Sequence, residues 1–302
     1  MKNFTIVIPT KNRLEELKIT LLKLEYLIKS ENIEIILVDD GSVDNTKEYI
    51  TENYLNIRYY RNEKSKGILA VRNKIFSLVN TDYVLSIDDD ANFLTEEVIA
   101  SVKKYFNENK NIGLVYFRSY WSKEKPKSIE TTLSSHRTRS FGAVSFAMKM
   151  SAWNSIPNLL EWFLFYGEED FIAYHFFKNK WEIHFFPEVL IHHRVDIKLR
   201  KKHKDYKIRL RRSLRSGWYL YILFFPVKEI PRRFLYTLWI QIRNKTLKGD
   251  LKSTIAIFQA LFDTFVNIPR LLKNSSRLTV QEFKEYQQLP DTKLYWRPEE
   301  EL

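Results

Sequence analysis

Tyr83-Val84-Leu85-Ser86-Ile87-Asp88-Asp89-Asp90 sets the class of fold, because an apolar, strand-like run ends there in three adjacent carboxylates. Val38-Asp39-Asp40-Gly41-Ser42 repeats the pattern closer to the N-terminus. Apolar runs that alternate with helix-period segments predict a parallel sheet wound with helices, whose carboxyl edge is where ligands bind. We therefore expect both acidic clusters at one edge of a single α/β sheet.

The first two thirds of the chain carry this alternating pattern throughout. The predicted strands are residues 4–8, 34–38, 57–60, 83–87, 113–118, 141–150 and 183–191. The spacing predicts helices over residues 14–28, 68–79 and 167–177, the first of them capped by Asn12 with Glu15 three residues later. The polar stretch from Tyr120 to Arg139 is typical of a loop.

Composition limits the chemistry of any metal site. The chain has 302 residues, of which 44% are hydrophobic, and no cysteine, so a metal has to be bound by oxygen or imidazole. Residues 1–3 lead directly into a strand-like run, and we expect no signal or transit peptide. The apolar run Trp218 to Val227 is about half of the ~20 residues that a spanning helix needs. We expect no segment to cross a bilayer and a cytoplasmic location.

The positive charge is concentrated in one part of the chain. Lys198 to Arg215 contains ten Lys or Arg against Asp205 alone, which accounts for +9 of the net +12. A basic block beside aromatic helices is typical of an anionic membrane surface, here the inner face of the cytoplasmic membrane. Packing of these aromatics on protein explains the same residues. Nucleic-acid binding leaves the acidic clusters unexplained.

The triplet Asp88-Asp89-Asp90 has two explanations in the residues alone. Alternate residues of an extended segment point to the same side, so Asp88 and Asp90 could bind one hard cation. A solvated acidic turn capping a helix that begins near Thr95 accounts for the same residues.

Several short motifs, in this order, resemble the donor-site motifs of glycosyltransferase family 2. They are Ile8-Pro9-Thr10-Lys11-Asn12-Arg13, Val38-Asp39-Asp40-Gly41-Ser42, Gly67 with Arg72-Asn73, Ile87-Asp88-Asp89-Asp90, Gly142-Ala143, Gly167-Glu168-Glu169-Asp170, and Pro187 with His192-His193. The resemblance implies a GT-A fold, a Rossmann-like mixed sheet flanked by helices, followed here by a basic, aromatic helical appendage. It also implies inverting transfer from a nucleoside-diphosphate sugar, with Mn²⁺ or Mg²⁺ as cofactor.

The resemblance implies roles for individual residues. The donor-contacting residues it implies are Thr10, Asn12, Arg13, Asp39, Asp40, Gly67, Arg72, Asp88 and Asp89. Asp90 is the first candidate for the metal, with Asp88 and one histidine beside it. Neighbouring strand residues point to opposite faces, so His192 and His193 compete, with a preference for His192.

A second run of acids, Glu168-Glu169-Asp170 at the start of the predicted helix 167–177, would supply the base. The resemblance implies Asp170 as the group that takes the acceptor proton, with Glu169 as its competitor because a one-residue shift of register is open. Acidic residues that favour the N-terminus of a helix explain the triplet equally well without chemistry.

The expected organisation is a catalytic domain over residues 1–196, followed by a helical region over residues 197–302. The donor part covers about residues 1–118 and the acceptor part about 119–196. We expect UDP-sugars before dTDP-sugars, and a saccharide or lipid-linked acceptor in polysaccharide or glycolipid biosynthesis. The alternatives are a sugar nucleotidyltransferase, which would need glycine in Pro9 to Arg13, and a non-catalytic scaffold or nucleic-acid-binding protein.

Overall fold

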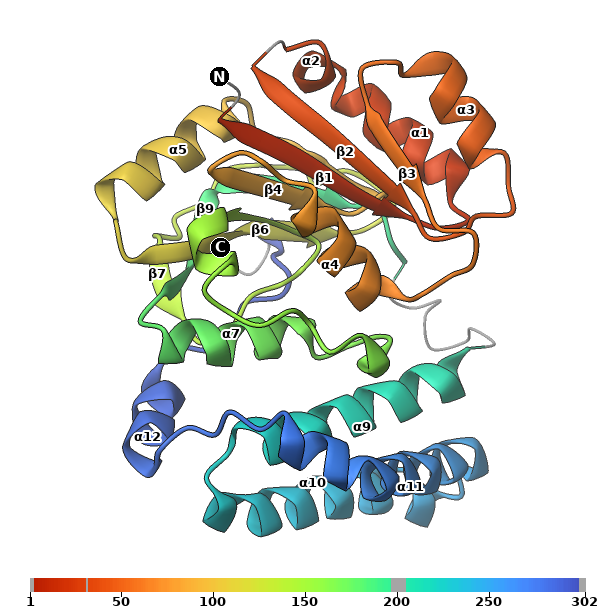
Figure 1. Cartoon of the computed structure of the whole chain (residues 1–302), viewed down its shortest axis with the longest axis vertical. Helices are drawn as coiled ribbons and strands as arrows, with labels where there is room; N and C mark the ends of the chain where they lie inside the picture. Colours follow the sequence, from red (N-terminus) through yellow and green to blue (C-terminus); the bar gives the residue numbers. More distant parts are fainter. Residues whose placement is uncertain (1–2, 31, 197–204, 299–302) are drawn as a thin grey trace.

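One nine-stranded mixed sheet forms the centre of the computed structural model, which describes residues 3–30, 32–196 and 205–298 (Figure 1). Residues 1–2, and residues 198–204 of the basic stretch, lie outside the described residues. The strands are β1 (Phe4–Thr10), β2 (Ile33–Asp39), β3 (Arg58–Arg61), β4 (Tyr83–Ile87), β5 (Ala91–Phe93), β6 (Ile112–Trp121), β7 (His136–Thr138), β8 (Ser145–Lys149) and β9 (Glu182–His193). Their order is β3-β2-β1-β4-β8-β6-β9-β5, with β7 pairing β9.

The register of the parallel strands brings the predicted motifs to one edge. β1 pairs β2 so that Thr10 lies opposite Asp39, and β4 pairs the other side of β1 in parallel. Beyond β4 the strand β8 runs antiparallel, while β6 and β9 are parallel to each other. The expectation of a mixed α/β sheet with both acidic clusters at one edge is confirmed.

Helices cover both faces of the sheet. On one face lie α1 (Leu14–Lys23), α2 (Glu25–Ile28), α3 (Thr46–Asn53) and α5 (Val98–Glu108). Their buried residues share a core with the side chains of β1 and β2 on that face. On the other lie α4 (Ile68–Ser77), α6 (Met150–Trp153), the short η1 (Glu161–Phe163) and α7 (Glu168–Lys178). α7 faces the C-terminal helices in Figure 1.

The C-terminal helices form a layer at the lower end of the molecule in Figure 1. They are α9 (Tyr206–Phe224), η2 (Val227–Glu229), α10 (Ile230–Asn244), η3 (Thr246–Lys248), α11 (Leu251–Lys273) and α12 (Val280–Gln288). Leu223 and Phe224 of α9 are buried in the same core as α4 and α7. The helical region therefore continues the hydrophobic core of the sheet.

Asn12 has a different structural role from the predicted helix cap. Its backbone lies in the left-handed region (φ 52°), and its Oδ1 accepts a 2.7 Å hydrogen bond from the Val43 amide. The helix begins only at Leu14, after Arg13. Asparagine tolerates this conformation because its side chain bonds to nearby backbone, and here it joins the loops that follow β1 and β2.

The expectation that no segment could cross a bilayer overlooked α11. This helix has 23 residues and is long and apolar enough to cross a membrane by length and composition alone. Asp263 and Pro269 interrupt its apolar sequence, which is why Trp218 to Val227 looked like the longest run. In the folded chain Asp263 is paired with Arg211, at 2.7 Å from its Nε.

Candidate active site

Asp88, Asp90 and His193 converge at the carboxyl edge of the sheet. Their candidate ligand atoms all lie within 4.8 Å of one another. The two carboxylates follow β4, and the histidine ends β9. The short strand β5 brings them together, because its first residue, Ala91, pairs with His193.

The second acid of the triplet is held by the loop after β1. Asp89 accepts a 2.8 Å hydrogen bond from the Thr10 hydroxyl and contacts Arg13 Nη1 at 3.2 Å. The other Arg13 nitrogen lies 2.6 Å from Asp90, whose side chain is almost fully buried, whereas the Arg13 side chain is 44% exposed. A solvated helix cap is therefore excluded, and the next helix begins only at Val98, without a side-chain cap.

The three carboxylates differ in their affinity for protons. Burial raises the pKa of Asp88 to about 8 and that of Asp89 to about 7, although arginines next to each oppose the shift. Burial acts on Asp90 too, but His193 and Arg13 outweigh it and lower its pKa. Asp90 is thus held as an anion, whereas Asp88 gains from a cation beside it.

The two adjacent histidines face different surroundings. His193 places Nε2 3.1 Å from Asp90 Oδ1, and its ring packs edge-on against Trp121 with centroids 4.6 Å apart. His192 is turned away, with Nε2 3.0 Å from the Ser122 carbonyl oxygen. The preference for His192 thus differs from the geometry. The two histidines do point to opposite faces, but two identical residues give no signal of which one faces the carboxylates.

A buried arginine behind the cluster was missed by sequence reasoning. Arg194 donates to Asn92, Glu16 and Thr20, while its own amide donates to the Asp90 carbonyl. Thr20 in turn donates to the carbonyl of Asp89 at 2.7 Å. This network fixes the backbone of the triplet, and its only sequence signal was an arginine directly after the two histidines.

The acids after β2 organise the neighbouring loops. Asp39 is fully buried and accepts from the Ser42 amide and the Tyr59 hydroxyl. Asp40 accepts from Asn62, Ser65 and the backbone amides of Lys66 and Gly67. These bonds offset burial and lower the pKa of Asp40.

Gly67 is required where it stands. Its φ is 92°, and a Cβ at this position would lie 2.8 Å from the Leu164 carbonyl oxygen. Any side chain would force this backbone apart.

Arg72 links the triplet to the acids at the start of α7. It is buried, donates to the Ala143 carbonyl at 3.2 Å and lies 3.8 Å from Asp88. Burial raises the pKa of Glu168 and Glu169, and Arg72 acts against both shifts.

Asp170 has a separate environment on the same helical turn. Burial raises its pKa, while a hydrogen bond from Ser140 and the charge of Arg139 oppose the shift. Ser140 lies within residues 119–196, the expected acceptor part. The pKa of both candidate bases is thus raised by burial, but the neighbouring Glu168 raises that of Glu169 further, whereas Ser140 opposes the rise for Asp170.

A C-terminal segment, residues 290–296, lies against the end of β6, within the part of the chain expected to bind the acceptor. The Trp296 amide donates to the Ser119 carbonyl at 2.7 Å, and its ring lies under Arg118 at 4.3 Å. Tyr295 packs near Trp121, the residue that contacts His193, with centroids 6.3 Å apart. Leu294 is the nearest neighbour of the position where Gly142 would carry a Cβ, at 3.7 Å.

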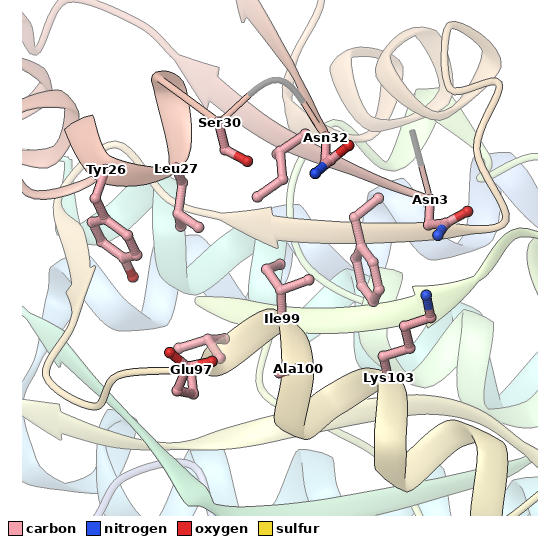
Figure 2. A pocket seen from close by; sticks show the side chains of 12 residues that line it. Asn3, Tyr26, Leu27, Ser30, Asn32, Glu97, Ile99, Ala100 and Lys103 are labelled. Atoms are coloured by element: carbon pink, nitrogen blue, oxygen red, sulfur yellow. The ribbon is translucent and has the colours of Figure 1, made fainter. Parts of the chain in front are cut away.

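A depression of about 570 Å³ lies at the opposite edge of the sheet (Figure 2). Asn3 and Asn32, at the amino ends of β1 and β2, line it together with Tyr26, Glu97 and Lys103. None of the motif residues of the carboxyl edge lines it, and we assign it no part in the chemistry.

The residues of the cluster fit a divalent metal. Two carboxylates and one imidazole nitrogen form the donor set that Mn²⁺ and Mg²⁺ sites use in a chain without cysteine. Asp90 Oδ1 is buried and lacks an aligned hydrogen bond within the described residues, although His193 lies beside it. A buried anionic oxygen of this kind favours a cation.

Solved structures share this fold. This chain superimposes on GalNAc-T7, solved with UDP, GalNAc and Mn²⁺, over 89% of its own length and 58% of that protein's (TM-score 0.60, 13% identity). Over 91% of this chain and 84% of the other, it superimposes on Staphylococcus aureus TarS 1–349 in complex with UDP-GlcNAc (TM-score 0.56, 17% identity). The protein therefore has a GT-A fold.

The sequence profile of glycosyl transferase family 2 matches residues 5–184, so the chain belongs to this family of glycosyltransferase enzymes. An uncharacterized glycosyltransferase of Mycoplasma genitalium, MG025, is 28% identical over 202 residues, 63% of this chain. The chain covers 60% of the length of that relative. Family membership argues against the nucleotidyltransferase, scaffold and nucleic-acid alternatives.

Proposed function

We propose that this glycosyltransferase moves a sugar, with inversion, from a nucleoside-diphosphate sugar to a hydroxyl group of an acceptor in one metal-assisted displacement. The observation that carries the proposal is the convergence of Asp88, Asp90 and His193 within 4.8 Å at the carboxyl edge of the sheet. That edge is where α/β sheets bind nucleotides.

These three side chains would hold Mn²⁺ or Mg²⁺. The ion would act as a Lewis acid that offsets the charge of the leaving diphosphate. Arg13 adds positive charge at the mouth of the site, since it is half-exposed and contacts both Asp89 and Asp90. Arg72 adds charge from the buried side, 3.8 Å from Asp88.

The donor nucleoside would lie over the loops after β1 and β2. Thr10 fixes Asp89, and Asn12 fixes the Val43 amide, so the two loops keep one shape before the donor arrives. Asp39, Asp40 and Gly67 hold the adjoining wall in the same way. Such preorganisation lowers the cost of ordering the site when ligand binds.

A carboxylate at the start of α7 would take the proton of the attacking hydroxyl. We assign this role to Asp170, which lies beside Ser140 on the acceptor side, and keep Glu169 as the competitor. Burial raises the pKa of both acids, as a general base requires. Single displacement needs this base on the face of the sugar opposite the diphosphate.

We propose UDP-sugars before dTDP-sugars as donors, although a neighbour of the same fold, the mannosyltransferase PcManGT, was solved with GDP-Man. GalNAc-T7 was solved with UDP and GalNAc, and TarS with UDP-GlcNAc. We propose a saccharide or lipid-linked saccharide as acceptor, in polysaccharide or glycolipid biosynthesis at the cytoplasmic side of the membrane. Residues 1–196 would form the catalytic domain, and residues 197–302 a helical region that belongs to it.

Calorimetric titration of the whole chain with UDP, dTDP and GDP, each with Mn²⁺ or with EDTA, tests the proposal. We expect one nucleotide to bind only when the metal is present. The control variant Asp82→Asn, which removes an exposed acid at the amino end of β4, should bind the nucleotide like the parent chain. Binding of no nucleotide by folded protein would contradict the donor site.

A further inference from the structure

The outer face of α11 exposes a continuous apolar stripe. Leu251, Ile255, Phe258, Phe262 and Phe265 recur every three or four residues, the spacing of one helical face, and Leu272 follows two turns later. Phe265 is 74% exposed, although a side chain of this size gains about 1.5–3 kcal/mol when it leaves water. A stripe of this length in contact with water is a strong indication of a partner.

The neighbouring helix extends the same kind of surface. Leu235, Tyr236 and Trp239 of α10 are exposed, as is Leu247 of η3, which connects α10 to α11. Figure 1 shows α10 and α11 together at the end of the molecule away from β1 to β3. We refer to these exposed residues of α10, η3 and α11 as the apolar face.

Cations stand at the ends of the helices that carry the apolar face. The sequence of α10 contains three arginines and no acidic residue. The exposed cations of the border are Arg232, Arg243, Lys248, Lys252, Arg270 and Lys273. Asp263, the acid within α11, is neutralised from the inside by Arg211 and Arg215.

Three arginines of the basic stretch have partners within the chain. Arg209, Arg211 and Arg215 belong to the basic stretch, but they pair with Asp205 and Asp263 of the chain itself. Arg215 also donates to the Phe163 carbonyl at 2.5 Å. Arg215 thus joins α9 to η1. The exposed cations named above lie on α10, η3 and α11 themselves, the elements that carry the apolar face.

We propose that the apolar face rests on the surface of an anionic lipid bilayer, with α10 and α11 lying in its interfacial plane. Exposed phenylalanines and a tryptophan with a cationic border form the surface that interfacial helices present to anionic lipid. The inner face of α11 is occupied, because Ile257 and Ala260 pack with Trp218 of α9. α11 is thus held flat against protein and is not free to cross the bilayer.

Charge decides against a second copy of the chain as the occupant. In a two-fold contact, the same surface patch meets itself. Such a contact here would bring the cationic border of one protomer against that of the other. Anionic headgroups complement this border instead. The inference goes beyond the proposed function, since it assigns a surface and a partner that sugar transfer does not require.

Co-sedimentation of the whole chain with phosphatidylcholine vesicles, with and without phosphatidylglycerol, tests the proposal. Phe258→Ser/Phe262→Ser/Phe265→Ser should lower the partition coefficient by about tenfold per phenylalanine. Lys248→Gln/Lys252→Gln/Lys273→Gln should lower it by about fivefold per lysine, and only when phosphatidylglycerol is present. The control Ile19→Ser/Leu22→Ser/Leu55→Ser removes exposed apolar residues elsewhere and should bind like the parent chain.

Two further measurements keep the proposal open to contradiction. Brominated lipids should quench Trp239 more strongly when bromine sits near the headgroup than near the chain end, and Trp239→Phe should remove that difference. Sedimentation equilibrium should give a monomer at the same concentration. No vesicle binding by folded protein, equal binding of the phenylalanine variant, or a dimer that this variant dissociates would overturn the proposal.

Discussion

At the carboxyl edge of the sheet the protein buries charge, whereas on α10 and α11 it exposes hydrocarbon. Asp89 and Asp90 are almost completely buried, yet they stand side by side as carboxylates. Phe258, Phe262 and Phe265 contact water over most of their surface. Both arrangements oppose the usual division between a hydrophobic interior and a polar exterior.

The two regions differ in whether contacts within the chain offset the cost of burying charge or of exposing hydrocarbon to water. At the sheet edge, His193 and Arg13 offset the burial of Asp90, and Thr10 and Arg13 contact Asp89. On the apolar face nothing within the described residues covers the phenylalanines. The first region is therefore built before its ligand arrives, and the second is completed only by an external surface.

Removing one anion from the buried cluster should have the largest effect. Asp90→Asn keeps the shape of the side chain but removes the charge that faces His193 and Arg13. We expect nucleotide-sugar turnover, followed as UDP release, to fall by about 10³-fold or more. Circular dichroism should show an intact fold. Turnover close to that of the Asp82→Asn control would remove Asp90 from the site.

The two candidate bases should separate binding from transfer. Asp170→Asn should lower kcat by about 10²–10³-fold with a panel of saccharide acceptors, because one proton acceptor is lost. Its affinity for UDP with Mn²⁺ should not change. Glu169→Gln is the matched comparison. If Glu169→Gln loses transfer while Asp170→Asn retains it, the base assignment moves by one residue.

Substitutions at two neighbouring positions of α11, one buried and one exposed, should differ in their effect on the free energy of unfolding. Ile257 is 2% exposed and Phe258 is 66% exposed. Ile257→Ala should lower the free energy of unfolding by about 2–4 kcal/mol, because it leaves a cavity. Phe258→Ala should change it by less than about 0.5 kcal/mol. Urea unfolding measures both, and equal losses would mean that Phe258 is covered by protein in solution.

A buried histidine between the sheet and the helical layer should give the smallest effect. Burial lowers the pKa of His175 to about 4, with Lys178 contributing, while the unfolded chain binds the proton near pH 6.5. The free energy of unfolding should therefore fall as the pH falls from 6.5 to 4, by about 2 kcal/mol at pH 5.

His175→Met should remove this part of the pH dependence of stability, whereas His136→Met, at an exposed histidine, should keep it. Thermal or urea unfolding at pH 7.5 and pH 5 measures the difference. An unchanged slope in His175→Met would show that other groups control acid stability.

The alternating pattern predicted the sheet because each long strand carries its own signal. The acids after β2 and β4 could be placed at one edge because parallel strands end together. β5 and β7 were not predicted, since three residues are too few for a period. The choice between His192 and His193 depended on the pairing of β5 with β9, a contact between distant segments.

Residues whose role depends on such contacts had no sequence signal. Trp121 lay in a stretch that looked like a loop, but β6 extends to it and places its ring against His193. Arg211 and Arg215 looked like part of a free basic surface, because their partner Asp263 lies 48 residues beyond Arg215 in the sequence and meets them only in the folded chain. The fold could thus be predicted from local pattern, but the partners of its charges could not.

The segment around Trp296 gives the site an order of assembly. All the site residues described above, the carboxylates, the histidines and the acids of α7, precede residue 194 in the sequence. Tyr295 and Trp296, the aromatic residues that pack beside them, follow about a hundred residues later. A ribosome must therefore extend the nascent chain past Trp296 before Tyr295 can reach Trp121. The wall beside His193 is therefore complete only when the C-terminal segment has packed back against β6.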